Sequence, residues 1–370
     1  MKNIAKSSKG LILLTGAAGF IGSHTIVELI EDGFDVLGVD NFYNSSPDAL
    51  EGINKIVEQS SAPNKGCFFF EEVDCTDYNK FDEIVEKYRS KSAENSDYRG
   101  IVGAIHFAAC KAVNESLEKP LLYYRNNIES LLNLITIMRK RSNNPNIVFS
   151  SSCTVYGQPA DEDLPIKENS PLQMPLTPYG KTKQMAEYIL QDCCNAYSNL
   201  KVCALRYFNP IGAHPSALIG ELPRGVPQNL VPFITQTAAG IRECLSVFGD
   251  DYNTPDGSCI RDYIWVVDLA KAHVAALNKM IENKLDKWEI FNIGTGKGTS
   301  VLELVNTFIR VTGVELKYRI APRREGDIEQ VWADASKAER ELEWKADTPL
   351  EDILLSAWKW QQRLGNVNES

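Results

Sequence analysis

The chain has 370 residues, of which 44% are hydrophobic and 24% charged, enough for one large α/β domain and a smaller second one. Its formal net charge of −10 argues against nucleic acid or an anionic membrane surface as a general partner. The chain lacks a long apolar run, its first ten residues are polar, and its nine cysteines include no Cys-x-x-Cys pair, so we expect a cytoplasmic protein without a membrane span or zinc site.

Short apolar runs alternate with amphipathic segments through the first half of the chain. We predict buried strands at Leu11–Thr15, Asp35–Asp40, Phe68–Asp74, Val102–Phe107, Ile147–Ser150 and Val202–Arg206. We predict helices at Ser23–Glu31, Tyr78–Tyr88, Leu121–Lys140 and Tyr179–Ala196. This alternation is typical of an α/β fold with a doubly wound parallel sheet, and the polar stretches at 60–65 and 90–97 are expected to be surface loops.

The pattern changes after about Phe208, where it becomes irregular and richer in proline and glycine. We therefore divide the chain into a Rossmann-like domain at residues 1–207 and a smaller C-terminal α/β domain at 208–370, which would cap a ligand. Segments near 262–267 and 290–293 are expected to return to the main sheet.

A glycine-rich turn, Gly16-Ala-Ala-Gly19-Phe-Ile-Gly22, follows the first predicted strand and opens the first helix. Such a turn lets the backbone approach a pyrophosphate at the helix N-terminus. The second strand ends in Asp40, whose carboxylate would accept from ribose hydroxyls and repel a 2′-phosphate. The pattern favours NAD over NADP; the alternative is a structural strand-to-helix turn.

Tyr179 and Lys183 lie four residues apart at the start of a predicted helix, so their side chains share one face. A nearby ammonium favours the phenolate, and we expect Lys183 to lower the pKa of Tyr179 from about 10 toward neutrality. The tyrosine would then serve as a general base. The spacing alone also fits a surface tyrosine beside a solvated lysine.

Ser152 follows a predicted strand, at the carboxyl edge where parallel sheets bind ligands. Its hydroxyl both donates and accepts, so it can relay a proton between a ligand hydroxyl and Tyr179. No Gly-x-Ser-x-Gly elbow surrounds it, which argues against a serine hydrolase. The four histidines show no metal-ligand spacing, and we interpret them as structural.

The glycine spacing and Tyr179-x-x-x-Lys183 together resemble the extended short-chain dehydrogenase/reductase superfamily. Further motifs narrow the resemblance to its UDP-hexose 4-epimerases, and it runs from about Leu11 to Trp344. These motifs are Thr15-Gly-Ala-Ala-Gly-Phe-Ile-Gly-Ser-His24, His106-Phe-Ala-Ala-Cys-Lys111, Ser150-Ser-Ser-Cys-Thr-Val-Tyr-Gly157, Arg206-Tyr-Phe-Asn-Pro210 and Ala321-Pro-Arg-Arg-Glu-Gly-Asp327.

The resemblance implies a site for tightly bound NAD and one for a UDP-hexose. It implies cofactor contacts from Gly16, Gly19, Phe20, Ile21, Gly22, Asp40, Asn41, Asn44, Ser45, Asp74, Cys75, Phe107, Ala108, Ala109, Lys111, Asn127, Ser152, Tyr179, Lys183 and Phe208. It implies substrate contacts from Ser152, Tyr179, Asn209, Asn229, Leu230, Val247, Phe248, Arg261, Arg324, Asp327 and Val331. Arg261 and Arg324 would clamp the diphosphate, and Phe248 would flank the uracil.

The implied reaction is epimerisation through a transient 4-keto sugar, with Tyr179, Lys183 and Ser152 as catalytic residues. A 4,6-dehydratase of the same superfamily would need an acidic pair where this chain has Cys153 and Thr154. A nucleotide-sugar decarboxylase would also need an acidic residue at this position. A non-catalytic NAD-binding sensor would typically lack Tyr179 or Lys183, and this chain has both.

The resemblance carries two further expectations. The helices at 121–140 and 179–196 are expected to pair across a two-fold axis in a homodimer, using apolar positions such as Leu131, Leu134, Ile135, Met185 and Ile189. Some related epimerases carry a tyrosine at the position of Val331, and the smaller valine predicts room for N-acetylated UDP-hexoses.

Overall fold

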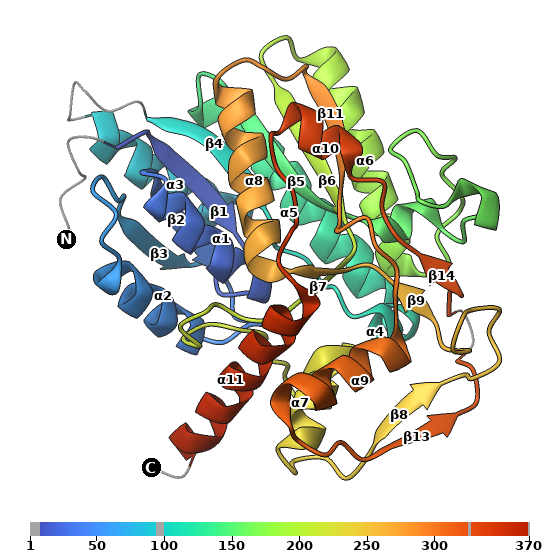
Figure 1. The fold of residues 1–370 in the computed structure, drawn as a ribbon. Coiled ribbons are helices and arrows are strands. Elements are labelled where there is room, and N and C mark those ends of the chain that lie inside the picture. Colours follow the sequence, from blue (N-terminus) through green and yellow to red (C-terminus); the bar gives the residue numbers. More distant parts are fainter. Residues whose placement is uncertain (1–7, 94–99, 325–326, 369–370) are drawn as a thin grey trace.

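A seven-stranded parallel sheet forms the centre of the computed structural model, which describes residues 8–93, 100–324 and 327–368 (Figure 1). Its strands, in spatial order, are β3 (Phe68–Glu72), β2 (Asp35–Asp40), β1 (Leu11–Thr15), β4 (Ile101–His106), β5 (Asn146–Ser152), β6 (Lys201–Tyr207) and β11 (Trp288–Ile293). The apolar runs predicted as strands account for six of the seven, because both faces of a parallel sheet are buried. The predicted α/β fold is confirmed.

Helices cover both faces of this sheet. One face carries α1 (Phe20–Glu31), α2 (Asp48–Gln59) and α8 (Val266–Ile281), and the other carries α3 (Tyr78–Ala93), α5 (Pro120–Arg141) and α6 (Pro178–Ala196). The sequence analysis missed α2, which buries Ile53 and Ile56 in the core, with Leu50 and Val57 partly buried beside them. The expected loop at 90–97 was wrong at its start, because α3 continues to Ala93; residues 94–97 lie outside the described residues.

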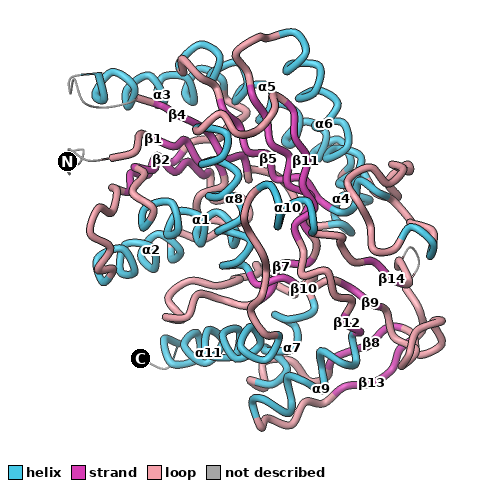
Figure 2. The backbone as a smooth tube through the Cα atoms, turned by 45° about the horizontal axis from the view of Figure 1, so that its top comes forward, coloured by secondary structure: helices cyan, strands magenta, loops and turns pink. Residues whose placement is uncertain are grey.

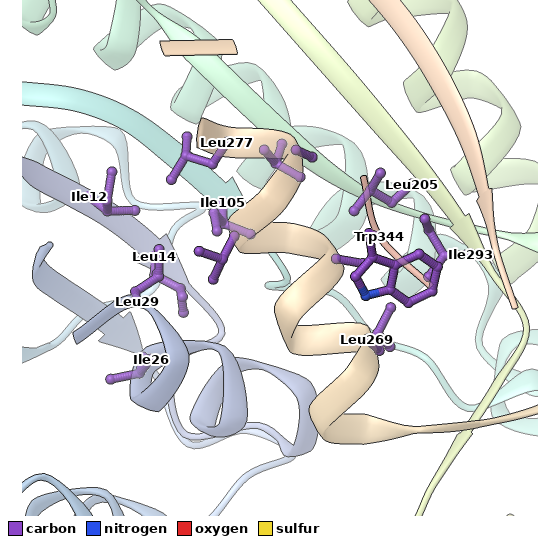
Figure 3. Close-up of a cluster of buried hydrophobic side chains, with 14 of the residues drawn as sticks. Ile12, Leu14, Ile26, Leu29, Ile105, Leu205, Leu269, Leu277, Ile293 and Trp344 are labelled. Carbon is purple, nitrogen blue, oxygen red and sulfur yellow. The ribbon is translucent and has the colours of Figure 1, made fainter. Parts of the chain in front are cut away.

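The larger hydrophobic core joins distant parts of the chain. Ile12 and Leu14 of β1 lie with Leu269 and Leu277 of α8, and Trp344 closes the cluster at one side (Figure 3). Thus α8 covers β4, β5 and β6 of the sheet although it lies after the predicted boundary at residues 207 and 208. The expected return near 290–293 is seen in β11, which forms the sheet edge beside β6.

The other expected return, near 262–267, was wrong. Strand β10 (Tyr263–Trp265) pairs with β7 (Asn209–Ile211) in a separate two-stranded sheet, and α8 begins directly after it. The physical reason is that the chain must leave the sheet plane to start a helix that packs on the sheet face. The division of the chain at residues 207 and 208 stays a prediction.

The second structural region packs around its own core, which includes Ile234, Leu304, Phe308 and Leu354. Its larger elements are α7 (Leu230–Ala238), β8 (Leu245–Phe248), α9 (Val301–Thr312), β13 (Tyr318–Ala321) and α11 (Leu350–Asn368) (Figure 2). Shorter elements are α4 (Val113–Glu118), η1 (Cys153–Tyr156), η2 (Asp161–Asp163), β9 (Ile260–Arg261), β12 (Thr299–Ser300), β14 (Gln330–Val331) and α10 (Ser336–Glu341). A capping box of Ser300 with Glu303 starts α9, and Gly313, at φ +68°, ends it.

Residues 213–229, which we call the crossing segment, run from the second region back across the first. Leu218 and Ile219 lie directly over Gly52 of α2, where a Cβ would be 2.3 Å from the Leu218 carbonyl oxygen. Arg224 donates to the carbonyl oxygens of Tyr43 and Ser45, at 3.1 and 2.6 Å. The segment therefore ties the two regions together beside the carboxyl ends of β1 and β2.

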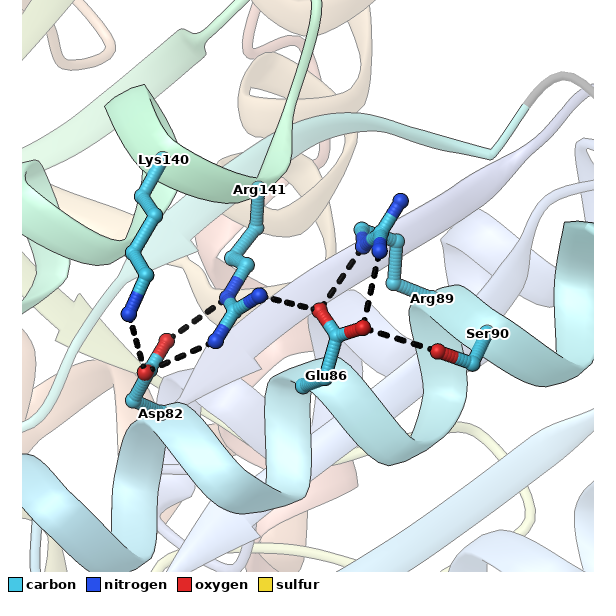
Figure 4. A network of polar contacts seen from close by, with 6 residues as sticks. All are labelled: Asp82, Glu86, Arg89, Ser90, Lys140 and Arg141. Carbon is cyan, nitrogen blue, oxygen red and sulfur yellow. Dashed lines mark hydrogen bonds and ion pairs between the residues drawn. The ribbon is translucent and has the colours of Figure 1, made fainter.

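An ion-pair network fastens α3 to α5 (Figure 4). Asp82 accepts from Lys140 at 2.7 Å and from two nitrogen atoms of Arg141 at 2.8 Å each. Arg141 also donates to Glu86, which pairs with Arg89 in the next turn of α3. None of the helices in the described ranges has the length and hydrophobicity that crossing a bilayer requires.

Candidate active site

The predicted cofactor and catalytic residues gather at the carboxyl edge of β1, β2, β4 and β5. In the turn after β1, Gly16 has φ +73°, and a Cβ there would lie 2.8 Å from the Ala108 amide nitrogen. A Cβ on Gly22 would lie 2.2 Å from the Gly16 carbonyl oxygen. Both positions therefore require glycine, and the turn packs closely against Phe107 and Ala108 after β4.

The N-terminus of α1 begins at Gly19, which supplies no side-chain cap. The first amides of a helix have no intrahelical acceptor, and the helix dipole favours an anion there. Phe20, Ile21 and Gly22 occupy this first turn. The structure thus places the glycine turn where a pyrophosphate can be bound by backbone amides.

The end of β2 is held by Asp40, which is buried. Its carboxylate accepts from the Ala18 amide at 3.0 Å, from the Phe42 amide at 2.9 Å and from the Ser45 hydroxyl at 2.8 Å. These bonds join the glycine turn to the loop after β2. A carboxylate has room for about four hydrogen bonds, so one position stays open for a ligand hydroxyl.

The predicted adenosine-end residues also meet. Asn41 donates to Asp74 at 3.0 Å, and Asn44 donates to the carbonyl oxygen of Ala109 at 3.1 Å. Cys75 is buried beside Asp74, and desolvation raises the pKa of its thiol. The loops after β2, β3 and β4 therefore form one wall of the candidate site.

Two of the predicted cofactor residues, Asn127 and Lys111, bind other residues of the chain through their side chains. Asn127 is buried and bridges the main chain of Cys110, at 2.8 and 3.1 Å, to the Thr182 hydroxyl at 3.1 Å. It fixes the loop after β4 against α6. Lys111 is half-exposed and pairs with Glu221 of the crossing segment at 3.4 Å. Glu221 also accepts from Asn229 at 2.6 Å, so it links a predicted cofactor residue with a predicted substrate residue.

The catalytic candidates converge where α6 begins. Thr177 caps this helix and Pro178 occupies its first turn, which places Tyr179 at the helix start. The Lys183 ammonium donates to the Ser150 carbonyl oxygen at 2.6 Å and lies 5.9 Å from the centre of the Tyr179 ring. The Ser152 hydroxyl at the end of β5 is hydrogen-bonded to Tyr179.

The expected effect of Lys183 on the Tyr179 pKa is wrong for the protein alone. Desolvation raises the pKa of Tyr179 to about 12, although the hydrogen bond with Ser152 acts in the opposite direction. Desolvation also lowers the pKa of Lys183 to about 7, opposed by the negative charge of Glu187. Burial dominates because it penalises the charged form of both side chains.

The uridine-end candidates form a separate group. Arg324 makes a bidentate ion pair with Asp327 at 2.8 and 2.9 Å, and its guanidinium lies 4.8 Å from the centre of the Phe248 ring. Val247 does not join them, because alternation along β8 turns its side chain into the core of the second region. The predicted substrate contact of Val247 stays a prediction and would have to come from its main chain.

The remaining substrate candidates lie in two places, some close to Phe208 and Cys153 and others at the start of α7. Val331 of β14 pairs with Arg261 of β9, and it packs in a buried cluster with Phe208. Cys153 of η1 packs against the same cluster, and the charge of Arg261 acts on its thiol. Asn209 begins β7 directly after Phe208. Asn229 and Leu230 begin α7 on the side of Glu221.

The sequence analysis missed Glu187, Arg206 and Glu221. Glu187 lies four residues after Lys183, so the repeat of the Tyr179-to-Lys183 spacing could have indicated that it shares their face. Arg206 was recognised only as part of a motif. Glu221 has no comparable signal, because its contacts with Lys111 and Asn229 depend on how the crossing segment folds back.

Comparison with known proteins agrees with this site. A family model described as GDP-mannose 4,6 dehydratase matches residues 13–356. A UDP-glucose 4-epimerase of Dictyostelium discoideum is 46% identical over 350 residues, which cover 95% of each chain. A UDP-glucose 4-epimerase of Bacillus subtilis is also 46% identical, over 96% of this chain and 98% of the relative.

Solved structures give the same result. A UDP-glucose-4-epimerase from Stenotrophomonas maltophila, with bound NAD and formylated UDP-arabinopyranose, is 42% identical with a TM-score of 0.87, over 97% of this chain and 99% of that one. A UDP-glucose 4-epimerase from Bifidobacterium longum, in complex with NAD+ and UDP, is 43% identical with a TM-score of 0.84, over 96% and 99%. Sequence and fold match along nearly the whole chain, and the chain belongs to the UDP-glucose 4-epimerase family of the extended short-chain dehydrogenase/reductase superfamily.

Proposed function

We propose that this chain interconverts UDP-galactose and UDP-glucose through a transient 4-keto sugar, with NAD bound tightly throughout. The observation that carries the proposal is the convergence of Tyr179, Ser152 and Lys183 at the carboxyl edge of β5, beside the glycine turn. That arrangement puts an acid–base group next to a dinucleotide site. The family relationship supports the same reaction.

The residues present fit the cofactor. Gly16 and Gly22 leave a cradle that any Cβ would fill, and the uncapped start of α1 offers amides to a pyrophosphate. Asp40 would bind the adenosine ribose and disfavour a 2′-phosphate, which selects NAD. Phe107, Ala108, Ala109 and Lys111 would line the middle of the dinucleotide, and Phe208 would border its nicotinamide end.

Tyr179 would take the proton from the hexose 4-hydroxyl, directly or through Ser152. When bound at this site, NAD+ would supply the hydride chemistry at C4, while Tyr179 would hold the proton from the 4-hydroxyl. Because burial holds the Tyr179 pKa at about 12, the phenolate depends on every favourable contact at this site. The Ser152 hydroxyl supplies one favourable contact as a hydrogen bond, and the Lys183 ammonium supplies a positive charge nearby.

The second region would hold the UDP moiety while the keto sugar turns. Arg261 and Arg324 would bind the diphosphate, since guanidinium groups match phosphate oxygens and the chain is otherwise acidic. Asp327 and Phe248 lie beside Arg324 and would bind the ribose and flank the uracil. Asn209, Asn229 and Leu230 would position the sugar-phosphate.

Val331 suggests a wider substrate range. It lies next to Arg261 in the β9–β14 pair and packs against Phe208, so it borders the space between the diphosphate and the nicotinamide end. A tyrosine there would extend into that space, whereas valine leaves it open to a 2-acetamido group. We infer that UDP-N-acetylglucosamine and UDP-N-acetylgalactosamine are also interconverted.

The dehydratase alternative has support only from the description of the family model. A dehydratase needs a carboxylate pair beside Ser152, and this chain has Cys153 and Thr154 there. Burial raises the pKa of the Cys153 thiol to about 12, so it stays protonated and cannot act as a base. The sensor alternative is disfavoured because Tyr179 and Lys183 are both present and joined to β5.

We infer a homodimer formed through α5 and α6. Leu132, Met185 and Tyr188 are exposed by 44%, 44% and 53% on these helices, which is unusual for side chains of that size. The surface differs from the predicted one, because Leu131, Leu134 and Ile135 lie in the core beneath. A cytoplasmic location and a domain boundary near residue 207 complete the proposal.

Mixing the purified protein with UDP-galactose tests the central reaction. The proposal expects UDP-glucose to accumulate to a fixed ratio without added NAD. A 4-keto-6-deoxy product would indicate a dehydratase. Retention of NAD without any turnover of UDP-galactose would support a sensor and contradict the proposal.

A further inference from the structure

Helix α6 contacts strand β5 through three side chains spaced four residues apart. Tyr179, Lys183 and Glu187 share one face of the helix. Tyr179 is hydrogen-bonded to Ser152, Lys183 donates to the Ser150 carbonyl oxygen at 2.6 Å, and Glu187 accepts from the Ser151 hydroxyl at 2.5 Å. Three consecutive serines of the strand are thus matched to three consecutive turns of the helix. The first two contacts involve catalytic residues, and the third has no role in the chemistry described above.

The carboxylate of Glu187 is almost fully buried. Arg206 of β6, which lies opposite Ser151 in the sheet, donates to both of its oxygen atoms at 2.9 and 2.6 Å. The side chains of Glu187 and Arg206 are only 4% and 2% exposed. A buried pair of this kind contributes little net stability compared with apolar side chains of the same size, so its presence calls for another explanation.

Arg206 is itself held at a fixed position. It donates to the Tyr156 hydroxyl at 3.0 Å and to the Glu168 carbonyl oxygen at 3.2 Å. Tyr156 in turn donates to Asn292 of β11 at 2.7 Å. The contacts with Tyr156 and Glu168 therefore fix the guanidinium, and the guanidinium fixes the carboxylate of Glu187 beneath the catalytic helix.

We propose that Glu187 is a positioning residue that sets the register of α6 on β5 and keeps Lys183 charged for catalysis. This inference rests on the proposed function for its kinetic consequences. If α6 slid or rotated on β5, Tyr179 would leave Ser152 and Lys183 would leave Ser150 together. Glu187 opposes this movement because its bonds to Ser151 and Arg206 would break as well.

The charge argument depends on what surrounds the Lys183 ammonium. On its own helix lie Tyr179 and Glu187, and β4 contributes His106. Tyr207 of β6 and Cys153 of η1 lie near Tyr179, and Arg206 of β6 lies against Glu187. Burial lowers the pKa of His106 to about 3, so this histidine is neutral at working pH. Glu187 is then the one negative group among these, and it offsets the positive charge of Arg206.

Replacing Glu187 by glutamine keeps the shape and removes the charge. Arg206 is then uncompensated, and the pKa of Lys183 is expected to fall by about one unit, within the range that nearby charges produce. The alkaline limb of the pH profile of kcat should shift to lower pH by the same amount. E187Q should then lose roughly tenfold more activity above this limb than below it. Thermal unfolding is recorded for the same samples.

Glu289→Gln is the matched control. Glu289 makes an ion pair of 2.7 Å with Lys337 at the β11 edge of the same sheet, away from α6. Glu289→Gln should change thermal unfolding without shifting the pH profile of kcat. If Glu187→Gln behaves like this control, with altered unfolding and an unmoved alkaline limb, Glu187 is a structural residue only and the proposal is overturned.

A second measurement needs no turnover. The titration of Lys183 is followed by NMR in protein with isotope-labelled lysine, and Lys183→Ala identifies its signal. The proposal expects a lower pKa in E187Q than in the unmodified protein, and equal values overturn it. This result stands even if UDP-galactose is not a substrate, so failure of the proposed function is recognised separately.

If E187Q does not fold, Ser151→Ala decides the positioning role. This change removes one hydrogen bond to Glu187 and keeps its pair with Arg206. We expect a several-fold loss of kcat with bound NAD retained. A kcat equal to that of the unmodified protein would overturn the proposal.

Discussion

The Lys183 ammonium is bound to the Ser150 carbonyl oxygen at 2.6 Å, so the main chain of β5 fixes the cation beside Tyr179. An ammonium has three donors, and this bond uses one of them. The same contact orients the other two N–H donors of Lys183. These donors are available to a cofactor ribose and to the surroundings of the Tyr179 hydroxyl. We therefore expect Lys183 to connect the proposed cofactor site with the proposed acid–base group.

Tyr179→Phe is expected to leave NAD bound and nearly abolish epimerisation. Phenylalanine keeps the ring packing and removes the acid–base group, whose loss typically costs about 10²- to 10⁴-fold in rate. Conversion of UDP-galactose and the NAD content after gel filtration are measured together. More than about half of the original activity would rule out Tyr179 as the base.

Lys183→Ala is expected to lower both kcat and the amount of NAD that survives gel filtration. The side chain serves the phenol and the predicted ribose contact at once, so both properties should fall. Lys181→Ala is the control on the same helix, because Lys181 lies two residues away and makes no contact with Ser150 in the described structure. Equal behaviour of the two variants would contradict the role of Lys183.

Val331→Tyr is expected to remove turnover of UDP-N-acetylgalactosamine and to spare UDP-galactose. The tyrosine ring would occupy the space that a 2-acetamido group needs next to Arg261. Both substrates are assayed with both proteins. The inference fails if the unmodified protein shows no turnover of UDP-N-acetylgalactosamine under conditions in which UDP-galactose turns over well.

The exposed apolar side chains of α5 and α6 predict the oligomeric state. Light scattering at micromolar concentration should give twice the mass of one chain. Tyr188→Arg should produce monomers, because it places a charge in the predicted helix bundle. Ile241→Arg is the control, since Ile241 is 62% exposed outside these two helices and should leave the dimer intact. A monomer for the unmodified protein would contradict the prediction.

The network of Asp82 predicts a pH effect on stability. Hydrogen bonds from Arg141 and Lys140 lower the pKa of Asp82 to about 2. An aspartate with a depressed pKa stabilises the folded state fully above its unfolded pKa of about 4, and this contribution disappears as pH falls toward 2. Asp82→Asn should therefore lower the free energy of unfolding near neutral pH by about 1 kcal/mol, given partial solvent screening.

Urea unfolding at several pH values checks this effect. The difference between Asp82→Asn and the unmodified protein should shrink below about pH 4. Glu51→Gln is the control, because Glu51 pairs with Lys55 on an exposed face of α2 and should change stability much less. A difference that is independent of pH would exclude the ionisation of Asp82 as its cause.

The sheet and most of its helices could be predicted from the sequence because their signals are local. Leu11–Thr15 and Asp35–Asp40 are apolar runs that the structure reproduces at both ends. Helix α2 also has a local signal that the sequence analysis overlooked, because Leu50, Ile53, Ile56 and Val57 recur at the spacing of an amphipathic helix. The segment near 262–267 was wrongly assigned to the main sheet, because its pairing with β7 joins residues far apart in sequence.

The candidate site likewise combines features with a local sequence signal and features that depend on the folded structure. Tyr179 and Lys183 were identifiable from spacing, and the glycine turn from its place between a strand and a helix. The shift in the pKa of Tyr179 could not be predicted, because the direction of the shift depends on how deeply the hydroxyl is desolvated. The outward side chains of α5 were also misassigned, since Leu131 and Leu132 are neighbours that point to opposite environments.

The contact between the crossing segment and α11 affects how the protein is made. Trp360 donates to the Glu221 carbonyl oxygen at 2.9 Å, and Gly220 is glycine where a Cβ would lie 2.6 Å from the Trp360 ring. Glu221 reaches Lys111 on the other side. A nascent chain that has emerged only through β6 therefore has neither α8 to cover its sheet nor α11 to support Lys111. The apolar face of the sheet stays uncovered until α8 has been made, and the ligand site is complete only after α11 has been made and packs against the crossing segment.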